Sequence, residues 1–220
     1  MPSWTQGADQ AFQLLFQACS WEQHERNMYD RVVAVPRLLA ARPGRSTGVT
    51  FADSQRIGLA TSRAPAGDIA RANGLLEDWS TRLGSRYGRR LEHVALAHYR
   101  DGADGVAFHG DRLGSLRPDT IVAIVSLGAP RRFLLRPSPR QPELAGMAGK
   151  TFELREGDLL VMGGSCQETW EHSIPKMRRA GPRLAVMFRE RWEEEEVRPI
   201  ASAGSGSLAS ERPLRRIAGR

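Results

Sequence analysis

Residues 151–189 read TFELREGDLLVMGGSCQETWEHSIPKMRRAGPRLAVMFR. Four short runs in this stretch are rich in Val, Ile and Leu, and turn-forming Gly, Pro and Asp separate them. They cover residues 151–154, 158–162, 169–174 and 183–189, and similar runs precede them at residues 94–99, 120–127 and 132–136. Many short strands at close spacing are typical of an antiparallel sandwich or barrel. This half of the chain therefore predicts a mainly β fold.

Helical patterns precede the strands. One apolar stripe recurs at helical spacing, with Asp9 placed to cap the helix, and is made of Phe12, Leu15, Phe16 and Cys19. A second stripe is made of Ile69, Ala72, Leu76, Trp79 and Leu83. Between them, residues 42–67 are rich in Gly, Pro, Ser and Thr and predict a long irregular segment, which in compact domains often belongs to a functional surface.

Three regions follow from these patterns, and together they predict an α+β fold. We expect helices in residues 1–90, the β core in residues 91–196, and a disordered basic tail in residues 197–220. A chain of 220 residues is long enough to bury a core without disulfides.

Composition indicates a soluble protein. Hydrophobic residues make up 40% of the chain, the first twelve residues lack a signal-peptide pattern, and the apolar runs are too short to span a bilayer. The two cysteines, Cys19 and Cys166, are far apart, which favours a reducing compartment, and Cys166 is expected to be a small buried residue and not a nucleophile. We expect a cytoplasmic monomer without a membrane segment.

The formal net charge of +7 raises the question of a nucleic-acid partner. Five arginines and one glutamate fall in residues 198–220, so this tail carries +4 and the rest of the chain +3. That weak basic bias does not by itself indicate nucleic-acid binding.

One of the five histidines is followed two residues later by a carboxylate, in His109-Gly110-Asp111. On a strand, residues i and i+2 point to the same face, so the imidazole and the carboxylate could bind one ion. A second histidine from a distant strand would complete the facial triad of non-haem Fe(II) oxygenases, which leaves coordination positions open for a co-substrate and O₂. Alone, the motif is weak, because histidine is more often a partly buried structural residue.

The context of His172 supports the triad. A turn and an apolar strand precede it, an arrangement that would return His172 across the sheet. Arg183 and Arg189 then bracket a further apolar strand and, being six residues apart, face the same way. Buried arginines need anionic partners, which a dicarboxylate and a metal-bound carboxylate would supply. The alternative is that both arginines lie at strand ends and reach water.

Several motifs occur in a specific order. They are YRDG at residues 99–102, HGD at 109–111, VSLG at 125–128, RFLLR at 132–136, GDLL at 157–160, WEHSIP at 170–175, and arginines at 183 and 189. This order resembles the AlkB family of Fe(II)- and 2-oxoglutarate-dependent dealkylases over roughly residues 91–191. The resemblance implies a double-stranded β-helix (jelly roll) behind an N-terminal nucleotide-recognition lid, with Fe(II), 2-oxoglutarate and O₂ as cofactor and co-substrates.

The resemblance also implies residue roles. His109, Asp111 and His172 would bind iron. Arg183 would pair with the distal carboxylate of 2-oxoglutarate, Arg189 would lie near its proximal carboxylate, and Tyr99 would donate its hydroxyl to the co-substrate; Tyr99 is otherwise read as a core aromatic.

Two positions depart from the family pattern. Ala97 stands where an asparagine is common, and Leu113 stands where many members have an acidic residue that reads the base.

Basic residues in two segments are candidate phosphate contacts. They are Arg131, Arg132, Arg136 and Arg140 in one segment and Lys176, Arg178 and Arg179 in the other. Phosphate binding needs clustered charge, so ordinary solvated strand edges are the alternative.

The sequence thus predicts oxidative dealkylation of N-alkylated bases in DNA as the function, with RNA as a further candidate partner. One alternative is an oxygenase acting on RNA, a protein side chain or a small molecule. Others are a non-catalytic nucleic-acid-binding module and a zinc hydrolase, which two histidines and one aspartate could also serve.

Overall fold

The computed structural model describes residues 1–28, 31–45, 64–110 and 119–190. Within these ranges the α-helices are α1 (Ala8–Ala18), α2 (Ala66–Tyr87) and the short α3 (Cys166–Thr169). The strands are β1 (Glu22–Met28), β2 (Arg31–Ala41), β3 (His93–Tyr99), β4 (Val106–His109), β5 (Val122–Gly128), β6 (Arg131–Pro137), β7 (Lys150–Leu154), β8 (Leu159–Met162), β9 (Trp170–Ile174) and β10 (Arg183–Arg189). None of the described helices is long and apolar enough to cross a bilayer.

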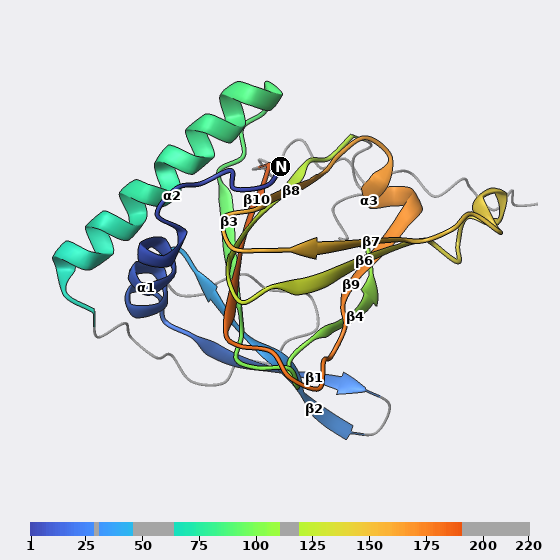
Figure 1. The fold of residues 1–220 in the computed structure, drawn as a ribbon, viewed down its shortest axis with the longest axis horizontal. Coiled ribbons are helices and arrows are strands. Elements are labelled where there is room, and N and C mark those ends of the chain that lie inside the picture. The colour runs from blue at the N-terminus through green and yellow to red at the C-terminus, as the bar shows by residue number, and fades with distance from the viewer. Residues whose placement is uncertain (29–30, 46–63, 111–118, 191–220) are drawn as a thin grey trace, which may run out of the picture.

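The strands form two antiparallel sheets that face each other (Figure 1). The larger sheet has the order β1-β2-β3-β10-β5-β8, and the smaller has the order β4-β9-β6-β7. Strands distant in sequence thus lie side by side, β10 between β3 and β5 in particular. This arrangement is the double-stranded β-helix that the sequence predicted.

The two long helices cover the outer face of the larger sheet (Figure 1). The predicted α2 stripe is buried: Leu76, Trp79 and Leu83 pack in one cluster with outward residues of the sheet. Each such large apolar side chain contributes about 1.5–3 kcal/mol through burial. Helix α2 ends at Gly88, whose φ of 64° closes the helix in the left-handed region that glycine tolerates.

One capping prediction was wrong. Asp9 lies inside the first turn of α1, and Gly7 is the N-cap residue. A carboxylate in the first turn still interacts favourably with the helix dipole, which explains why the sequence pattern resembled a cap.

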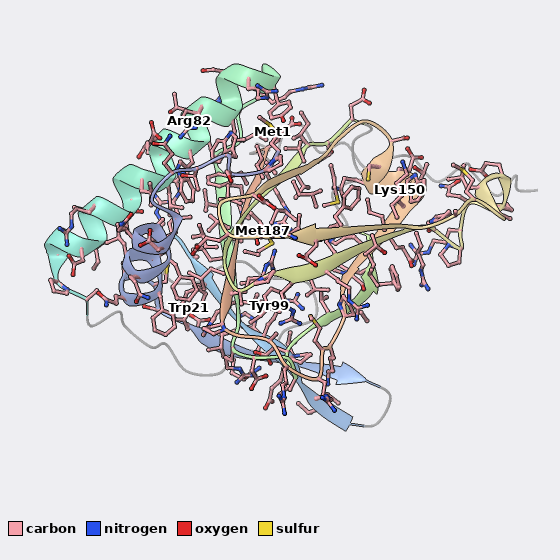
Figure 2. The ribbon with its side chains drawn as sticks, in the orientation of Figure 1. Met1, Trp21, Arg82, Tyr99, Lys150 and Met187 are labelled. Atoms are coloured by element: carbon pink, nitrogen blue, oxygen red, sulfur yellow. The ribbon has the colours of Figure 1, made fainter. Side chains whose placement is uncertain are left out.

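A second apolar cluster fills the space between the sheets. It combines residues of the larger sheet, Tyr99, Ala97 and Ile124 among them, with Phe133 and Ile174 of the smaller sheet. Figure 2 shows Tyr99 and Met187 inside the body of the protein. The candidate site lies in this inner layer.

Three strands had no clear sequence signal. β1 and β2 form a hairpin that continues the larger sheet, so the expected boundary near residue 90 falls within a region joined by one sheet. β4 is only four residues long. Most of the predicted irregular segment 42–67, and the predicted tail 197–220, lie outside the described residues.

Candidate metal and co-substrate site

His109 and His172 lie opposite each other in the smaller sheet. His109 is the last residue of β4, and its Cα partner on β9 is His172. The ring centroids are 4.3 Å apart, and the ring planes meet at 50°. Antiparallel pairing therefore brings together two of the three predicted metal ligands from distant parts of the sequence.

Neighbouring groups orient both rings. His109 Nδ1 lies 2.8 Å from the carbonyl oxygen of Ala107. A neutral His109 that donates this hydrogen bond carries its lone pair on Nε2, the nitrogen that would bind a metal. The His172 ring stacks on buried Phe133, with centroids 5.4 Å apart and planes 10° apart. Such support is what metal-ligating histidines normally receive from outer residues.

The third predicted ligand, Asp111, lies outside the described residues. Within the described ranges, no three His, Cys, Asp or Glu side chains gather as a metal site. A metal between the two histidines would therefore need a further ligand, and Asp111 follows His109 by two positions. The base-reading position Leu113 also lies outside the described residues.

Arg183 occupies the inner face at one end of β10. Its Cα partners are Tyr99 on β3 and Gly128 on β5. Its Nε donates to Ser126 Oγ at 2.9 Å, and its guanidinium carbon lies 5.3 Å from the centroid of the Tyr99 ring. The side chain is 1% exposed. Tyr99 and Arg183, each predicted from the sequence to contact the co-substrate, therefore lie side by side.

The charge of Arg183 is incompletely satisfied by the protein. Nη1 and Nη2 are both buried and have no hydrogen-bond partner. Burial lowers the pKa of Arg183 to about 10, with Tyr99 acting in the opposite direction. A buried guanidinium with two unpaired nitrogens is costly unless an anion completes it. The fork of Nη1 and Nη2 suits a carboxylate, so these residues fit the distal end of 2-oxoglutarate.

Arg189 lies on the same inner face of β10 and is also buried. Its Nη2 lies 3.8 Å from Met187 Sδ. The prediction that Arg183 and Arg189 face the same way is confirmed, and the alternative that both reach water at strand ends is wrong. Their Cα atoms are about 20 Å apart on an extended strand. Only guanidiniums that lean toward each other could act on one small dicarboxylate.

The departure at Ala97 leaves an apolar wall beside the pair. Ala97 is 1% exposed and faces Ala185 across the β3–β10 register. Two alanines opposite each other provide space and no hydrogen-bonding group. A co-substrate bound here would rely on Arg183, Tyr99 and the metal for its polar contacts.

The predicted phosphate contacts separate into different environments. Arg131 is fully buried, so its prediction as a phosphate contact is wrong: its side chain points into the core from β6. Arg136 is exposed, but it pairs with Glu171 at 2.8 Å and lies over the Phe108 ring. The others, exposed in the structure, are Arg132, Arg140, Lys176, Arg178 and Arg179.

Two hollows lie outside the histidine pair. One of about 510 Å³ is bordered by Arg178, Arg179 and the turn that contains Gly102. A larger one of about 730 Å³ lies between α1, the start of α2 and the turn at Gly128. Neither His109, His172 nor Arg183 lines the larger hollow, so its size does not make it the chemical centre.

The cysteines carry no reactive thiol. Both are free; burial raises the pKa of Cys19 to about 12 and also raises that of Cys166. Thiolates, and not thiols, are nucleophiles. The reading of Cys166 as a packing residue agrees with its contact with the inner cluster.

Two supporting residues received no role from the sequence. Ser126 holds Arg183, and Phe133 supports His172. Both belong to motifs of the family-like order, at residues 125–128 and 132–136, so their position in that order was the available signal. Their contacts depend on cross-strand register, which one sequence does not reveal.

Comparisons with known proteins agree with this geometry. A family model described as the 2OG-Fe(II) oxygenase superfamily matches residues 4–212. The chain is 31% identical over 120 residues to the DNA oxidative demethylase ALKBH2 of Arabidopsis thaliana, covering 46% of this chain and 38% of the relative.

Two further relatives are both called alpha-ketoglutarate-dependent dioxygenase alkB homolog 3. Identity to the Rattus norvegicus protein is 31% over 140 residues, which cover 61% of this chain and 45% of the relative. Identity to the Homo sapiens protein is 32% over 120 residues, which cover 52% of this chain and 42% of the relative. The matched regions span less than half of each relative. The predicted AlkB resemblance is confirmed.

Proposed function

Because this chain belongs to the 2OG-Fe(II) oxygenase superfamily and works with Fe(II), 2-oxoglutarate and O₂, we propose that it oxidatively removes alkyl groups from N-alkylated nucleobases in DNA. Membership of this family makes the chain an enzyme. The alternatives of a zinc hydrolase and of a non-catalytic nucleic-acid-binding module are therefore set aside.

When bound, iron and 2-oxoglutarate together activate O₂, so that the N-alkyl carbon gains a hydroxyl while 2-oxoglutarate becomes succinate and CO₂. The N–C bond of the hydroxylated group then breaks: its electron pair stays on the base nitrogen, the hydroxyl proton passes to that nitrogen or to solvent, and the carbon leaves as an aldehyde. His109, His172 and the predicted ligand Asp111 would hold the iron. The chain itself contributes positioning and charge, and the cofactor contributes the reactivity.

Inner-face residues would orient the co-substrate. Arg183 would donate hydrogen bonds from Nη1 and Nη2 to the distal carboxylate, while its Nε donates to Ser126 Oγ and fixes its position. Tyr99, on the neighbouring strand, would donate its hydroxyl toward the same molecule. The apolar wall of Ala97 and Ala185 would exclude water along its carbon chain. This arrangement, and the unpaired buried guanidinium above all, carries the chemical part of the proposal.

The nucleobase substrate is supported by similarity to proteins named as a DNA oxidative demethylase and as alkB homologs. Two exposed features of this chain add to that support. The β1–β2 hairpin presents Val32 and Val33, exposed near its tip, where apolar side chains could pack against an unstacked base. The loop with Lys176, Arg178 and Arg179 supplies exposed positive charge.

The test is to offer the Fe(II)-loaded chain oligonucleotides that carry 1-methyladenine, 3-methylcytosine or an etheno adduct. Product masses and released formaldehyde or glyoxal are followed in single strands and duplexes. We expect repair, with single strands accepted at least as readily, because flipping a paired base costs a few kcal/mol. Succinate formation stimulated by a peptide or small molecule, with no adduct repaired in either strand form, would overturn the nucleobase proposal and leave the oxygenase assignment intact.

A further inference from the structure

Arg131 is a buried arginine that is neither a predicted metal ligand nor a predicted co-substrate contact. Its side chain is fully buried in the layer between the sheets. Nη1 donates to the carbonyl oxygen of Asp101 at 3.0 Å, and Nη2 donates to those of Asp104 at 2.7 Å and Pro175 at 3.0 Å. Its Nε has no hydrogen-bond partner. Burying a guanidinium without a carboxylate partner is expensive, and the three carbonyl acceptors satisfy Arg131 only in part because its Nε stays unpaired.

The Arg131 guanidinium lies beside the co-substrate pair. Its carbon is 5.4 Å from the centroid of the Tyr99 ring, almost the same distance as that of Arg183. Within the described residues, no carboxylate forms an ion pair with either guanidinium. Burial lowers the pKa of Arg131, and its positive charge in turn helps to lower that of Arg183. Two like charges around one ring leave an excess of positive charge at the predicted position of a dianion.

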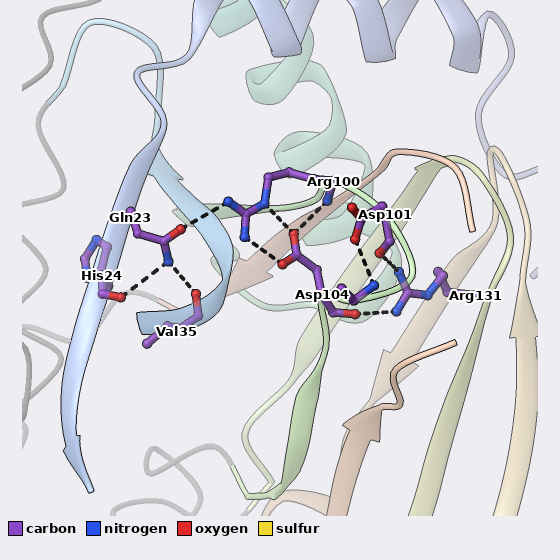
Figure 3. A network of polar contacts seen from close by, with 8 residues as sticks. Gln23, His24, Val35, Arg100, Asp101, Asp104 and Arg131 are labelled. Carbon is purple, nitrogen blue, oxygen red and sulfur yellow. Dashed lines mark hydrogen bonds and ion pairs between the residues drawn. The ribbon is translucent and has the colours of Figure 1, made fainter. Parts of the chain in front are cut away.

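Arg131 also holds the loop that links Tyr99 to the strand of His109. Asp104 in this loop is buried. Arg100 donates hydrogen bonds to its carboxylate from Nη2 at 2.7 Å and from Nε at 2.8 Å. The backbone N–H of Arg100 donates to the same carboxylate. Figure 3 shows that the network continues to Gln23, whose Oε1 accepts a bond from Arg100. The side chain of Gln23 in turn donates to the Val35 carbonyl, so both strands of the β1–β2 hairpin are reached.

Backbone contacts close the loop on its other sides. The N–H of Gly105 donates to the carbonyl of Pro36 in β2, and the N–H of Met177 donates to the carbonyl of Gly102. A Cβ at Gly102 would stand 2.2 Å from the Met177 oxygen, so only glycine allows this approach. The loop therefore touches the hairpin, the segment after His172, and the end of β3 at Tyr99. Arg131 is the side chain that bonds to it from inside.

We infer that Arg131 is a positioning residue for the co-substrate: its charge adds to that of Arg183 in favouring a dicarboxylate, and its hydrogen bonds fix the loop beside Tyr99. Arg131 acts through Tyr99 and Arg183 and does not itself touch the co-substrate. The inference rests on the family's use of 2-oxoglutarate and not on the proposed nucleobase substrate, so failure of one leaves the other standing.

The test measures binding without turnover. The chain is loaded with Mn(II), and its affinities for 2-oxoglutarate and for 2-oxopentanoate, which lacks the distal carboxylate, are measured by calorimetry. Arg131→Met should weaken 2-oxoglutarate about tenfold or more, the size of effect seen when outer supporting residues are removed. Affinity for 2-oxopentanoate should change much less. Arg131→Lys keeps the charge and should recover part of the preference for the dicarboxylate.

The matched control is Arg155→Met, because Arg155 follows the β7 residue that pairs with Arg131 but is exposed and bonds only at the surface. It should leave both affinities unchanged. If Arg131→Met does not fold, the comparison of the two ligands is made on Arg131→Lys, which should then bind 2-oxoglutarate more weakly than wild type. Equal losses for both ligands, or an unchanged ratio in a folded Arg131 variant, would overturn the inference and leave Arg131 as a packing residue.

Discussion

The two faces of strand β10 differ in chemistry: the outer face is apolar, and the inner face carries two buried arginines. Its outer residues Leu184, Val186 and Phe188 are fully buried in the cluster beneath the helices. Its inner residues begin and end with buried arginines, and Nη1 and Nη2 of Arg183 lack hydrogen-bond partners. One strand therefore contributes apolar packing on one side and unsatisfied charge on the other. The difference indicates which face the protein needs for stability and which for a ligand.

A buried histidine lies on the outer face of β3, the strand that pairs with β10. His98 is buried with neither ring nitrogen hydrogen-bonded, packed against Phe16 and Trp21. Burial lowers the pKa of His98, against the smaller opposing effect of the Asp104 charge, and this favours the neutral imidazole as an aromatic packing group. A neutral imidazole tolerates such a place far better than a guanidinium would.

The largest effect should come from the histidine pair of the smaller sheet. Replacing His109, Asp111 or His172 by Ala should abolish 2-oxoglutarate turnover while leaving the thermal unfolding temperature nearly unchanged, because the predicted role of these side chains is to bind the metal. Succinate formation is the measurement, and His24→Ala in the hairpin is the control. Two variants of the three with wild-type rates would remove the triad assignment.

Arg183→Lys tests the inner face directly. Lysine keeps the positive charge but loses the planar fork and the bond to Ser126. Disrupting a desolvated, hydrogen-bonded charge pair costs on the order of 2–5 kcal/mol, so the 2-oxoglutarate concentration for half-maximal turnover should rise strongly. An unchanged titration curve would assign recognition of the distal carboxylate to another residue.

Leu184→Ala tests the outer face at the neighbouring position. Leu184 is fully buried, and its truncation should lower the free energy of unfolding by about 2–5 kcal/mol. The affinity for 2-oxoglutarate in the folded variant should stay at the wild-type value. Denaturant unfolding and 2-oxoglutarate titration are measured on the same preparation, so that the losses of stability and of affinity can be compared with those of Arg183→Lys. A loss of affinity without a loss of stability would contradict the division between the faces.

The smallest effect concerns the loop between β3 and β4, which contains Asp104, and depends on pH. The hydrogen bonds and charge of Arg100 lower the pKa of Asp104 below its ordinary value near 3.9. Its stabilisation is therefore fully present above about pH 4 and is lost as the pH falls through the lowered folded-state pKa. The stability difference between wild type and Asp104→Asn should narrow below about pH 4 in denaturant titrations. A difference independent of pH would show that the carboxylate charge does not matter there.

The sequence predicted the elements whose residues repeat with a clear period. β10 is an apolar run bracketed by two arginines, and α2 carries a long apolar stripe, so both were placed closely. β1 begins Glu-Gln-His-Glu and has no alternating apolar pattern, so its pairing with β2 had no local signal. Neighbouring strands determine the structure of such a segment.

The site shows the same limit. The histidines and Arg183 follow from motif order, because their chemistry restricts residue type. Arg131 and Arg132 are adjacent arginines on one strand, and the local sequence shows no acceptor that would keep either of them buried. Only the buried carbonyls of the facing loop decide that Arg131 is the inner one.

The most direct test of the central claim is anaerobic binding of Fe(II) and 2-oxoglutarate to the wild-type chain. Chelation of iron by the keto and carboxylate oxygens of 2-oxoglutarate gives a weak charge-transfer band in the visible spectrum. We predict that the wild type and Leu184→Ala show the band, that His172→Ala lacks it, and that Arg183→Lys needs much more 2-oxoglutarate to reach it. A folded wild-type chain that develops no band at saturating Fe(II) and 2-oxoglutarate would contradict the account.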